Sequence, residues 1–253
     1  MQQQTSILLT ILTLLLSLGC DKEIVIVHDH NLIADGCIPE KIVSVGFLGV
    51  NEDEYVYENN RLIRYGDKFV EYNNGLVSKI TLGSKRYEEY YYNDQFQVNK
   101  SIMLREDDHE EGFIVIDEKE YKYEGNRIVE IIDIDSDETN LISYYPNSNN
   151  IDSIKTINGN SEIIEILIFQ YDEYKNPQKN LLIPKFNYSW WIERGFENNV
   201  IQRKKIKIQD QGETQIWNYD MEYNAFGYPT KIVGNIDNFG FNSITEITYT
   251  KCE

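Results

Sequence analysis

An aromatic-to-asparagine rhythm that recurs along most of the chain limits what the chain can fold into. Each copy is an apolar-x-Tyr step, then two to five residues rich in Asn, Gly and Asp, and then an apolar strand start. Asn and Gly tolerate the positive φ that tight turns require, so each copy predicts a β-hairpin. The copies begin at Tyr55, Val70, Tyr90, Tyr121, Ser143, Phe169 and Met221. In series they predict a long antiparallel meander.

Within the copies, apolar and polar residues alternate. Every second residue from Trp217 to Tyr223 is apolar or aromatic, and Asn218, Asp220 and Glu222 lie between them. Period-two alternation gives a sheet with one buried and one wet face. No ten-residue stretch after the leader has the apolar spacing of a covering helix. A sheet with an aromatic face and no helical layer must curl or close. The sequence therefore predicts an all-β fold, an antiparallel meander of tyrosine-centred hairpins that forms one strongly curved sheet or partial barrel.

One segment breaks the rhythm. Between Pro177 and Asn199 the chain is rich in large apolar residues but has no alternating strands and turns. The part from Leu181 to Phe196 is interpreted either as a plug packed on the open side of the sheet or as a lid over a cavity.

The first residues of the chain form an apolar leader. Residues 1–19 contain no charged side chain, and Ile7 to Leu18 form a nearly unbroken apolar run. A run of this length is shorter than the roughly 20 residues that span a bilayer, and it suits the core of a secretory signal. It ends in Ser17-Leu18-Gly19-Cys20, which resembles the lipobox of bacterial lipoproteins, in which the cysteine is acylated before cleavage. An uncleaved anchor and a plain secretory signal are the alternatives, and each of them also exports the chain.

The predicted organisation follows from this leader. Residues 1–19 are a lipoprotein signal peptide, residues 20–37 are the lipidated Cys20 and a tether, and residues 38–253 are a single β-repeat domain. A membrane bound through acyl chains such as palmitate is the expected partner. The expected location is the cell envelope at the outer membrane, on either its periplasmic or its surface side.

Net charge excludes one class of partner. The leader is uncharged, so the domain carries the whole formal charge of −18. An acidic surface of this size repels polyanions, so no nucleic-acid partner is expected.

Two cysteines besides Cys20 lie at opposite ends of the domain. Cys37 follows the tether and Cys252 is the penultimate residue. In an oxidising compartment they either form one disulfide that closes the domain or are buried separately.

The repeats resemble a group of uncharacterised lipoproteins common in Bacteroidota, which are built from tyrosine-centred β repeats and are distantly similar to the YD repeats of RHS proteins. The segments that carry the resemblance are Tyr171 to Pro177, Asn198 to Val200, Tyr223 to Ile232 and Ile247 to Thr250. The resemblance implies a β-repeat fold but no activity. Only Tyr171-Asp172 and Tyr219-Asp220 keep the Asp of a YD repeat, so the closed shell of RHS proteins is not expected.

Candidate metal sites and catalytic motifs are weak. His28 and His30 fall in the tether, and His109 lies in an acidic run typical of a solvated loop. Asp133, Asp135 and Asp137 match the opening of a calcium loop but lack its later Gly and Glu, so a hairpin turn is the preferred interpretation. No nucleophile elbow, phosphate loop or dinucleotide fingerprint is present. No metal, cofactor or enzymatic activity is therefore expected.

Three hypotheses for function follow. The leading one is a non-enzymatic envelope lipoprotein with a binding or scaffolding role, whose ligand or protein partner is unknown. The second is a carrier of an apolar ligand in a concave aromatic sheet face. The third is a surface glycan-binding module that uses Trp190, Trp191 or Trp217 as a stacking platform. The basic cluster Arg203 to Lys207 is interpreted as a charged edge or wet-face strand, with a stripe for an acidic partner as the alternative.

Overall fold

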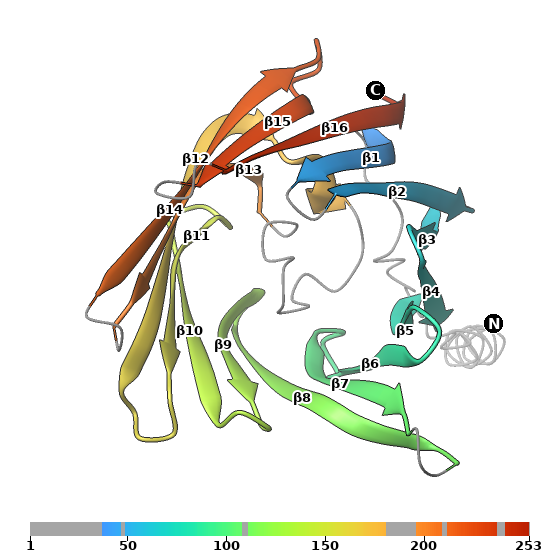
Figure 1. The fold of residues 1–253 in the computed structure, drawn as a ribbon. Helices are drawn as coiled ribbons and strands as arrows, with labels where there is room; N and C mark the ends of the chain where they lie inside the picture. The colour runs from blue at the N-terminus through green and yellow to red at the C-terminus, as the bar shows by residue number, and fades with distance from the viewer. Residues whose placement is uncertain are drawn as a thin grey trace, which may run out of the picture.

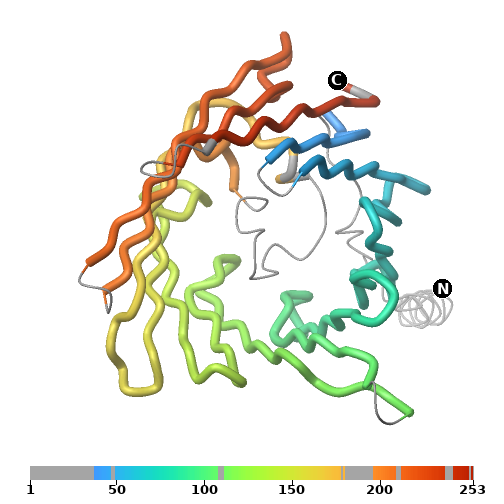
Figure 2. The backbone as a smooth tube through the Cα atoms, in the orientation of Figure 1, coloured from blue at the N-terminus to red at the C-terminus, as the bar shows by residue number. Residues whose placement is uncertain are grey.

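The computed structural model describes residues 37–46, 49–107, 111–180, 196–208, 212–236 and 241–252. In this part of the chain sixteen strands form a closed antiparallel barrel in sequence order (Figure 1). The first strand lies beside the last, which Figure 2 shows as blue against red. The predicted all-β meander is confirmed, and its curvature goes as far as full closure.

The strands differ in length but follow one another without a crossover. They are β1 (Ile38–Gly46), β2 (Gly49–Glu58), β3 (Arg61–Tyr65), β4 (Lys68–Asn73), β5 (Leu76–Leu82), β6 (Arg86–Tyr92), β7 (Val98–Glu106), β8 (Phe113–Glu124), β9 (Arg127–Asp133), β10 (Glu138–Tyr144), β11 (Ile151–Ile157), β12 (Ile163–Lys175), β13 (Asn198–Lys207), β14 (Glu213–Tyr223), β15 (Pro229–Ile236) and β16 (Phe241–Lys251), with one 3-10 turn, η1 (Pro177–Asn180), after β12.

Six of the seven predicted hairpins form tight connections. They join β2–β3, β4–β5, β6–β7, β8–β9, β10–β11 and β14–β15. We call the barrel end that carries these turns the tyrosine rim, and the other end, with the turns at residues 66–67, 83–85, 107–112, 134–137 and 158–162, the acidic rim. The turns use left-handed backbone at Asn59, Asn60, Asn74 and Gly125, as the sequence predicts.

The seventh predicted hairpin, at Phe169 to Asp172, is wrong. Asp172 lies inside β12, which continues to Lys175 before it pairs with β13. The ladder is irregular between Tyr171 and Lys175, so the Asp marks a bulge and not a turn. Asp172 there accepts a hydrogen bond from the backbone N–H of Asn199, at 3.1 Å, and so makes a contact within the sheet.

A repeated tyrosine contact runs around the tyrosine rim. The tyrosine near the end of an even-numbered strand donates its hydroxyl to a carbonyl near the start of the preceding strand. The pairs are Tyr57–Pro39, Tyr72–Leu62, Tyr92–Val77, Tyr123–Val98, Tyr144–Ile128, Tyr171–Ile151 and Tyr249–Pro229, with O···O distances of 2.6 to 2.9 Å. In β14 the corresponding Tyr223 bonds instead to the carboxylate of Asp172. Seven of the eight even-numbered strands therefore share one interaction.

The two faces of the wall differ in chemistry. Buried apolar residues form two clusters on the inner face, one around Ile80 and Leu62 and the other around Ile131 and Phe169. Residues paired across strands share a face, so the register places Lys–Glu and Arg–Glu pairs on the outer face. These pairs are Lys41–Glu52, Arg64–Glu54, Lys79–Glu71, Lys100–Glu118, Lys122–Glu130 and Lys231–Glu222.

The tyrosine contact predicts a stability effect. Replacing Tyr72 with Phe removes the hydroxyl that Leu62 O accepts at 2.8 Å and leaves a part-buried carbonyl without this donor. We expect Tyr72→Phe to lower the free energy of unfolding in urea by about 1–2 kcal/mol. Tyr91→Phe is the matched control, because the Tyr91 hydroxyl donates only to Glu89 on an exposed surface. Equal effects of the two substitutions would show that the contact between Tyr72 and Leu62 makes no specific contribution to the free energy of unfolding.

Candidate functional site

A cavity of about 270 Å³ lies inside the barrel, beside the seam where β1 meets β16. Its walls come from β1, β2 and β13 to β16, together with residues that follow β12. We call it the seam chamber. Its polar lining residues are Ser44, Asn51, Asp53, Asn176, Asn199, Ser243 and Thr245. Its apolar and aromatic lining residues are Ile42, Tyr55, Pro177, Val200, Tyr219, Met221, Pro229, Ile232 and Ile247.

Strand register brings these residues together. Ile42 pairs with Ile247 and Ser44 with Thr245 across the seam, so residues about two hundred positions apart share one face. The hydroxyls of Ser44 and Thr245 lie 3.0 Å apart. Because this contact joins the first and last strands, the chamber exists only in the closed barrel.

A glycine shapes one wall of the chamber. Gly234 pairs with Tyr219 on one side and with Ser243 on the other. A Cβ at this position would lie 2.6 Å from the Ser243 hydroxyl and 3.3 Å from the Tyr219 ring. Gly234 therefore lets Tyr219 and Ser243 approach each other on the inner wall.

A polar clasp lies beside the chamber, toward the tyrosine rim. Asn199 is 5% exposed and donates to Asp172 from both its backbone and its side-chain nitrogen, at 3.1 Å in each case. The Tyr223 hydroxyl donates to the same carboxylate. Burial raises the pKa of Tyr223, and the hydrogen bond to Asp172 and the charge of that carboxylate raise it further. These hydrogen bonds connect β12, β13 and β14 beside the chamber.

The chemistry of the chamber suits binding. Asp53 is the one ionisable acid among the lining residues, and the Asn51 amide lies 3.1 Å from its carboxylate. The remaining polar groups are hydroxyls and amides, which both donate and accept hydrogen bonds. The described residues that line the chamber include no His, Cys, Lys or Arg that could act as a nucleophile or as a base paired with one. The arrangement can hold a small molecule by hydrogen bonds on one side and apolar contact on the other.

A second group of ionisable residues lies on the inner wall of β6 to β9. Glu88 is 3% exposed and accepts a hydrogen bond from the Tyr90 hydroxyl at 2.7 Å. Burial raises the pKa of Glu88, against the opposing effects of hydrogen bonds from Tyr90 and Ser101 and of the Lys119 charge. Lys119 is itself buried and forms ion pairs with Asp117 and Asp133. These charges lie among apolar groups, where changes in ionisation have a large effect on stability.

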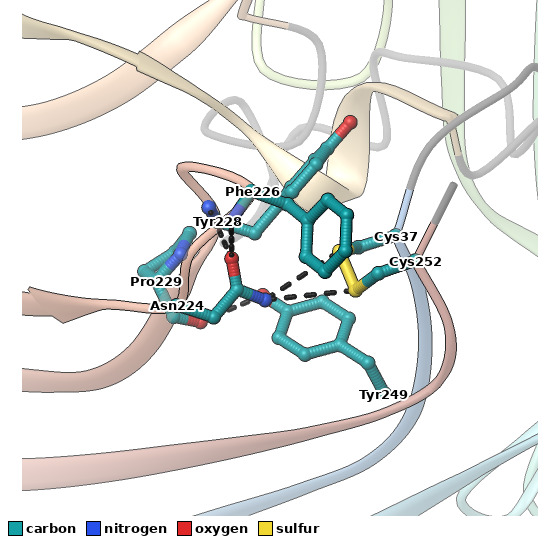
Figure 3. The surroundings of a disulfide bond; sticks show 7 residues. All are labelled: Cys37, Asn224, Phe226, Tyr228, Pro229, Tyr249 and Cys252. Atoms are coloured by element: carbon teal, nitrogen blue, oxygen red, sulfur yellow. Dashed lines mark hydrogen bonds between the residues drawn. A yellow bond between two sulfur atoms is a disulfide. The ribbon is translucent and has the colours of Figure 1, made fainter.

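The structure joins Cys37 and Cys252 in a disulfide across the ends of β1 and β16 (Figure 3). The side-chain nitrogen of Asn224 lies 3.5 Å from each sulfur. Asn224 also accepts hydrogen bonds from the backbone N–H groups of Phe226 and Tyr228 and so holds the β14–β15 turn beside the disulfide.

Trp217 lies on the inner wall and is part-exposed. The guanidinium of Arg203 is 4.1 Å from the centre of the indole, so a cation covers one stacking face. Trp217 does not line the seam chamber.

The edge-strand interpretation of Arg203 to Lys207 is wrong. These residues belong to β13, which is paired on both sides and has no free edge. Arg203, Lys205 and Lys207 share the inner face with Phe169, Leu167 and Glu165, because they pair with these residues. Lys205 forms an ion pair with Glu165. A closed sheet has no edge for these charges to protect.

The acidic run at Asp133, Asp135 and Asp137 forms the β9–β10 turn, as preferred from the sequence. Asp133 accepts a hydrogen bond from the Ser136 N–H at 3.0 Å, and Asp137 has φ 54°. Among the described residues no three His, Cys, Asp or Glu side chains come together in a way that could hold a metal ion.

Several predicted features lie outside the described residues. They are the leader and Cys20, the tether with His28 and His30, His109, Trp190, Trp191 and all but Phe196 of the segment from Leu181 to Phe196. Phe196 is buried and lies edge-on to Tyr171, with ring centres 5.1 Å apart. In the chain that the structure does describe, no helix is long and apolar enough to cross a bilayer.

Sequence reasoning missed the seam chamber. Alternation could have assigned Tyr219 and Met221 to the inner face, but nothing local marks Asp53, Ser44 or Thr245 as their neighbours. These residues belong to different ends of the chain and meet only through closure.

No known family model matches the sequence, and no curated protein does. Among solved structures, the chain is similar to a porin-like protein from Bacteroides vulgatus, with a TM-score of 0.60 and 13% identity over 85% of this chain and 99% of that one. It also aligns with a porin-like protein from Bacteroides uniformis, at 8% identity over 87% of this chain and 99% of that one, with a TM-score of only 0.29. The first likeness establishes a shared barrel fold.

The buried Glu88 predicts a pH dependence. Its raised pKa means that the folded state binds the proton more tightly than the unfolded state. The free energy of unfolding therefore falls as the pH rises from the ordinary Glu range through the raised pKa. We expect Glu88→Gln, which keeps a polar group but cannot ionise, to flatten this fall and to raise stability at neutral pH. Urea unfolding at a series of pH values from acidic to neutral measures this pH dependence of the free energy of unfolding. Glu89→Gln on the outer face controls for net charge, and an unchanged slope in Glu88→Gln would contradict the assignment.

Proposed function

We propose that this chain is a non-enzymatic envelope lipoprotein whose closed barrel binds a small amphipathic molecule in the seam chamber. The observation that carries the proposal is the chamber itself, in which hydroxyl, amide and carboxylate groups face apolar side chains. The porin-like likeness supports a barrel without an enzymatic site. Anchoring rests on the apolar leader and on Cys20, and it agrees with the exported, oxidised state that a disulfide requires.

Outward ion pairs support a barrel wall that stands in water. Lys122–Glu130 and Lys100–Glu118 lie on the outer face of adjacent strands, with N···O distances of 2.7 Å in both pairs. A charged side chain on the lipid face of a barrel costs about 2–4 kcal/mol near the bilayer midplane. Pairs of this kind around the wall therefore favour attachment through an acylated Cys20 over a wall embedded in lipid.

The size and polarity of the chamber favour a small ligand that has both a polar and an apolar part. Its volume of about 270 Å³ lies just below the roughly 300–1,000 Å³ of ligand pockets, so the ligand must be small. Hydroxyl and amide groups on β1, β2 and β16, such as those of Ser44 and Asn51, offer hydrogen bonds that a wholly apolar ligand cannot use. This refines the idea of an apolar-ligand carrier. A glycan stacked on Trp217 is less well supported, because Arg203 covers one face of the indole.

Ligand binding is tested with 1-aminoanthracene, an apolar ring system with one amino group, whose fluorescence rises in a protein cavity. We expect the purified domain to bind it, and Met221→Trp, which fills the chamber from β14, to weaken binding by about tenfold or more. Val233→Trp on the outer face of β15 is the matched control, since Val233 pairs with outward Asp220. Thermal unfolding verifies that both variants fold. Absence of binding by the parent, or equal binding by both variants, removes the proposed chamber function.

The anchor has its own test. We expect the chain produced in a bacterial host to carry acyl chains on Cys20, with residues 1–19 removed, and to sediment with membranes. Cys20→Ala should lose the acyl mass and leave the membrane fraction, because lipid chains supply the attachment. Intact-mass measurement and membrane sedimentation read out the two effects. A parent chain that is cleaved elsewhere, or is not acylated, would remove the lipoprotein assignment.

A further inference from the structure

We propose that the tyrosine rim of the barrel rests against the lipid surface, with Phe96 and Phe226 at the interface, and that the acidic rim faces away from it. This orientation rests on the proposed anchor at Cys20. It assigns a contact surface to one end of the barrel, which the anchor alone does not do.

The two rims differ in charge. The tight turns of the tyrosine rim, at residues 59–60, 73–75, 93–97, 125–126, 145–150 and 224–228, contain a single acidic residue, Asp94. In the longer β12–β13 connection, Lys179 and Glu197 lie 3.8 Å apart and balance each other. The described turns of the acidic rim contain Asp67, Asp107, Glu111, Asp135, Asp137 and Glu162, with Lys85 as their one basic residue. A membrane surface, which is neutral or anionic, favours contact with the neutral rim.

Exposed aromatic side chains lie on the neutral rim. Phe96 in the β6–β7 turn is 56% exposed, and Phe226 in the β14–β15 turn is 54% exposed. Both turns are built alike, because Asn93 and Asn224 each accept two backbone N–H groups of their own turn. Phe96 has φ 59°, a left-handed conformation that is unfavourable for a bulky residue. Both side chains are therefore more than half exposed at the neutral end of the barrel, where a lipid surface can reach them.

The tether reaches the barrel at this rim. The described chain begins at Cys37, which the disulfide fixes to Cys252, and Asn224 holds the Phe226 turn beside that bond (Figure 3). Seventeen positions separate Cys20 from Cys37, so the anchored end of the chain joins the barrel at the tyrosine rim. The opposite orientation requires the chain to pass the whole wall before it reaches the lipid.

The acidic rim has exposed aliphatic and aromatic residues of its own, and it is the rival surface. Val50 is 70% exposed and Phe113 is 53% exposed. Phe113 follows the turn that carries Asp107 and Glu111, so inserting it would move these carboxylates toward lipid, where losing their water is costly. The same acidic groups favour water, which directs this rim away from the membrane.

The test places new tryptophans on both rims of the lipidated full-length mature chain. Phe96→Trp, Phe226→Trp and the acidic-rim control Phe113→Trp are reconstituted in phosphatidylcholine vesicles with and without brominated acyl chains. The emission that each added tryptophan contributes beyond the parent is compared. We expect brominated lipid to quench this emission by about half or more in Phe96→Trp and Phe226→Trp, as for interfacial aromatic residues, and to leave Phe113→Trp unchanged.

The outcomes separate the two proposals. Vesicle-bound, acylated protein in which Phe113→Trp is quenched instead, or in which neither tyrosine-rim variant is quenched, overturns the orientation while the anchor stands. Protein that carries no acyl chains and stays off the vesicles overturns both. Amide exchange of the parent chain avoids any folding defect of the variants. Vesicle binding should slow exchange at residues 93–97 and 224–228 but not at residues 134–137, and the reverse pattern overturns the orientation.

Discussion

The barrel depends on one repeated hydrogen bond, from a tyrosine hydroxyl to a backbone carbonyl on the neighbouring strand. It joins even-numbered strands to the strands before them from Tyr57–Pro39 to Tyr249–Pro229. Each bond fixes the two strands at the same rim, so the strand starts stay aligned around the ring. Burial raises the pKa of Tyr72 and Tyr144 to about 12, so these hydroxyls stay protonated donors at any physiological pH. The aromatic rings fill the inner face behind these bonds, so one residue type serves both the alignment of paired strands and the packing of the core.

Closure of the barrel places polar and charged side chains on an enclosed inner face, which an open sheet does not have. In the ring every strand has two neighbours, and the inner face becomes an enclosed surface. Near the tyrosine rim this surface is aromatic and aliphatic, and farther along it includes Glu88, Lys119 and Lys205. The seam chamber forms in the sector of β1, β2 and β13 to β16, where small side chains such as those of Ser44 and Ser243 leave space that larger side chains would fill. The proposed binding in this chamber depends on the same seam that the disulfide secures.

Charge is arranged by rim and by face. Lysines of the outer wall pair with glutamates across strands, and the described turns of one end carry six acidic residues against one lysine. The opposite end is rich in asparagine, whose side chains bond within their own turns, as Asn93 and Asn224 do. An amide satisfied locally brings no net charge to a surface. This division gives the barrel one end whose described turns are nearly neutral and one whose described turns are acidic, although its strands follow one pattern.

The sequence by itself determined the local structure, because turns and alternation are short-range properties. Asn59-Asn60 and Asn74-Gly75 supply left-handed backbone, and the alternation from Trp217 to Met221 assigned faces correctly. Asp172 was misplaced, because a bulge and a turn use the same residue types and only the pairing of β12 with β13 distinguishes them. Tertiary structure alone decided that β1 meets β16, that Ser44 lies beside Thr245, and that Arg203, Lys205 and Lys207 face inward. Those contacts join residues tens to hundreds of positions apart, and a periodicity of two residues contains no information about which distant strand completes the ring.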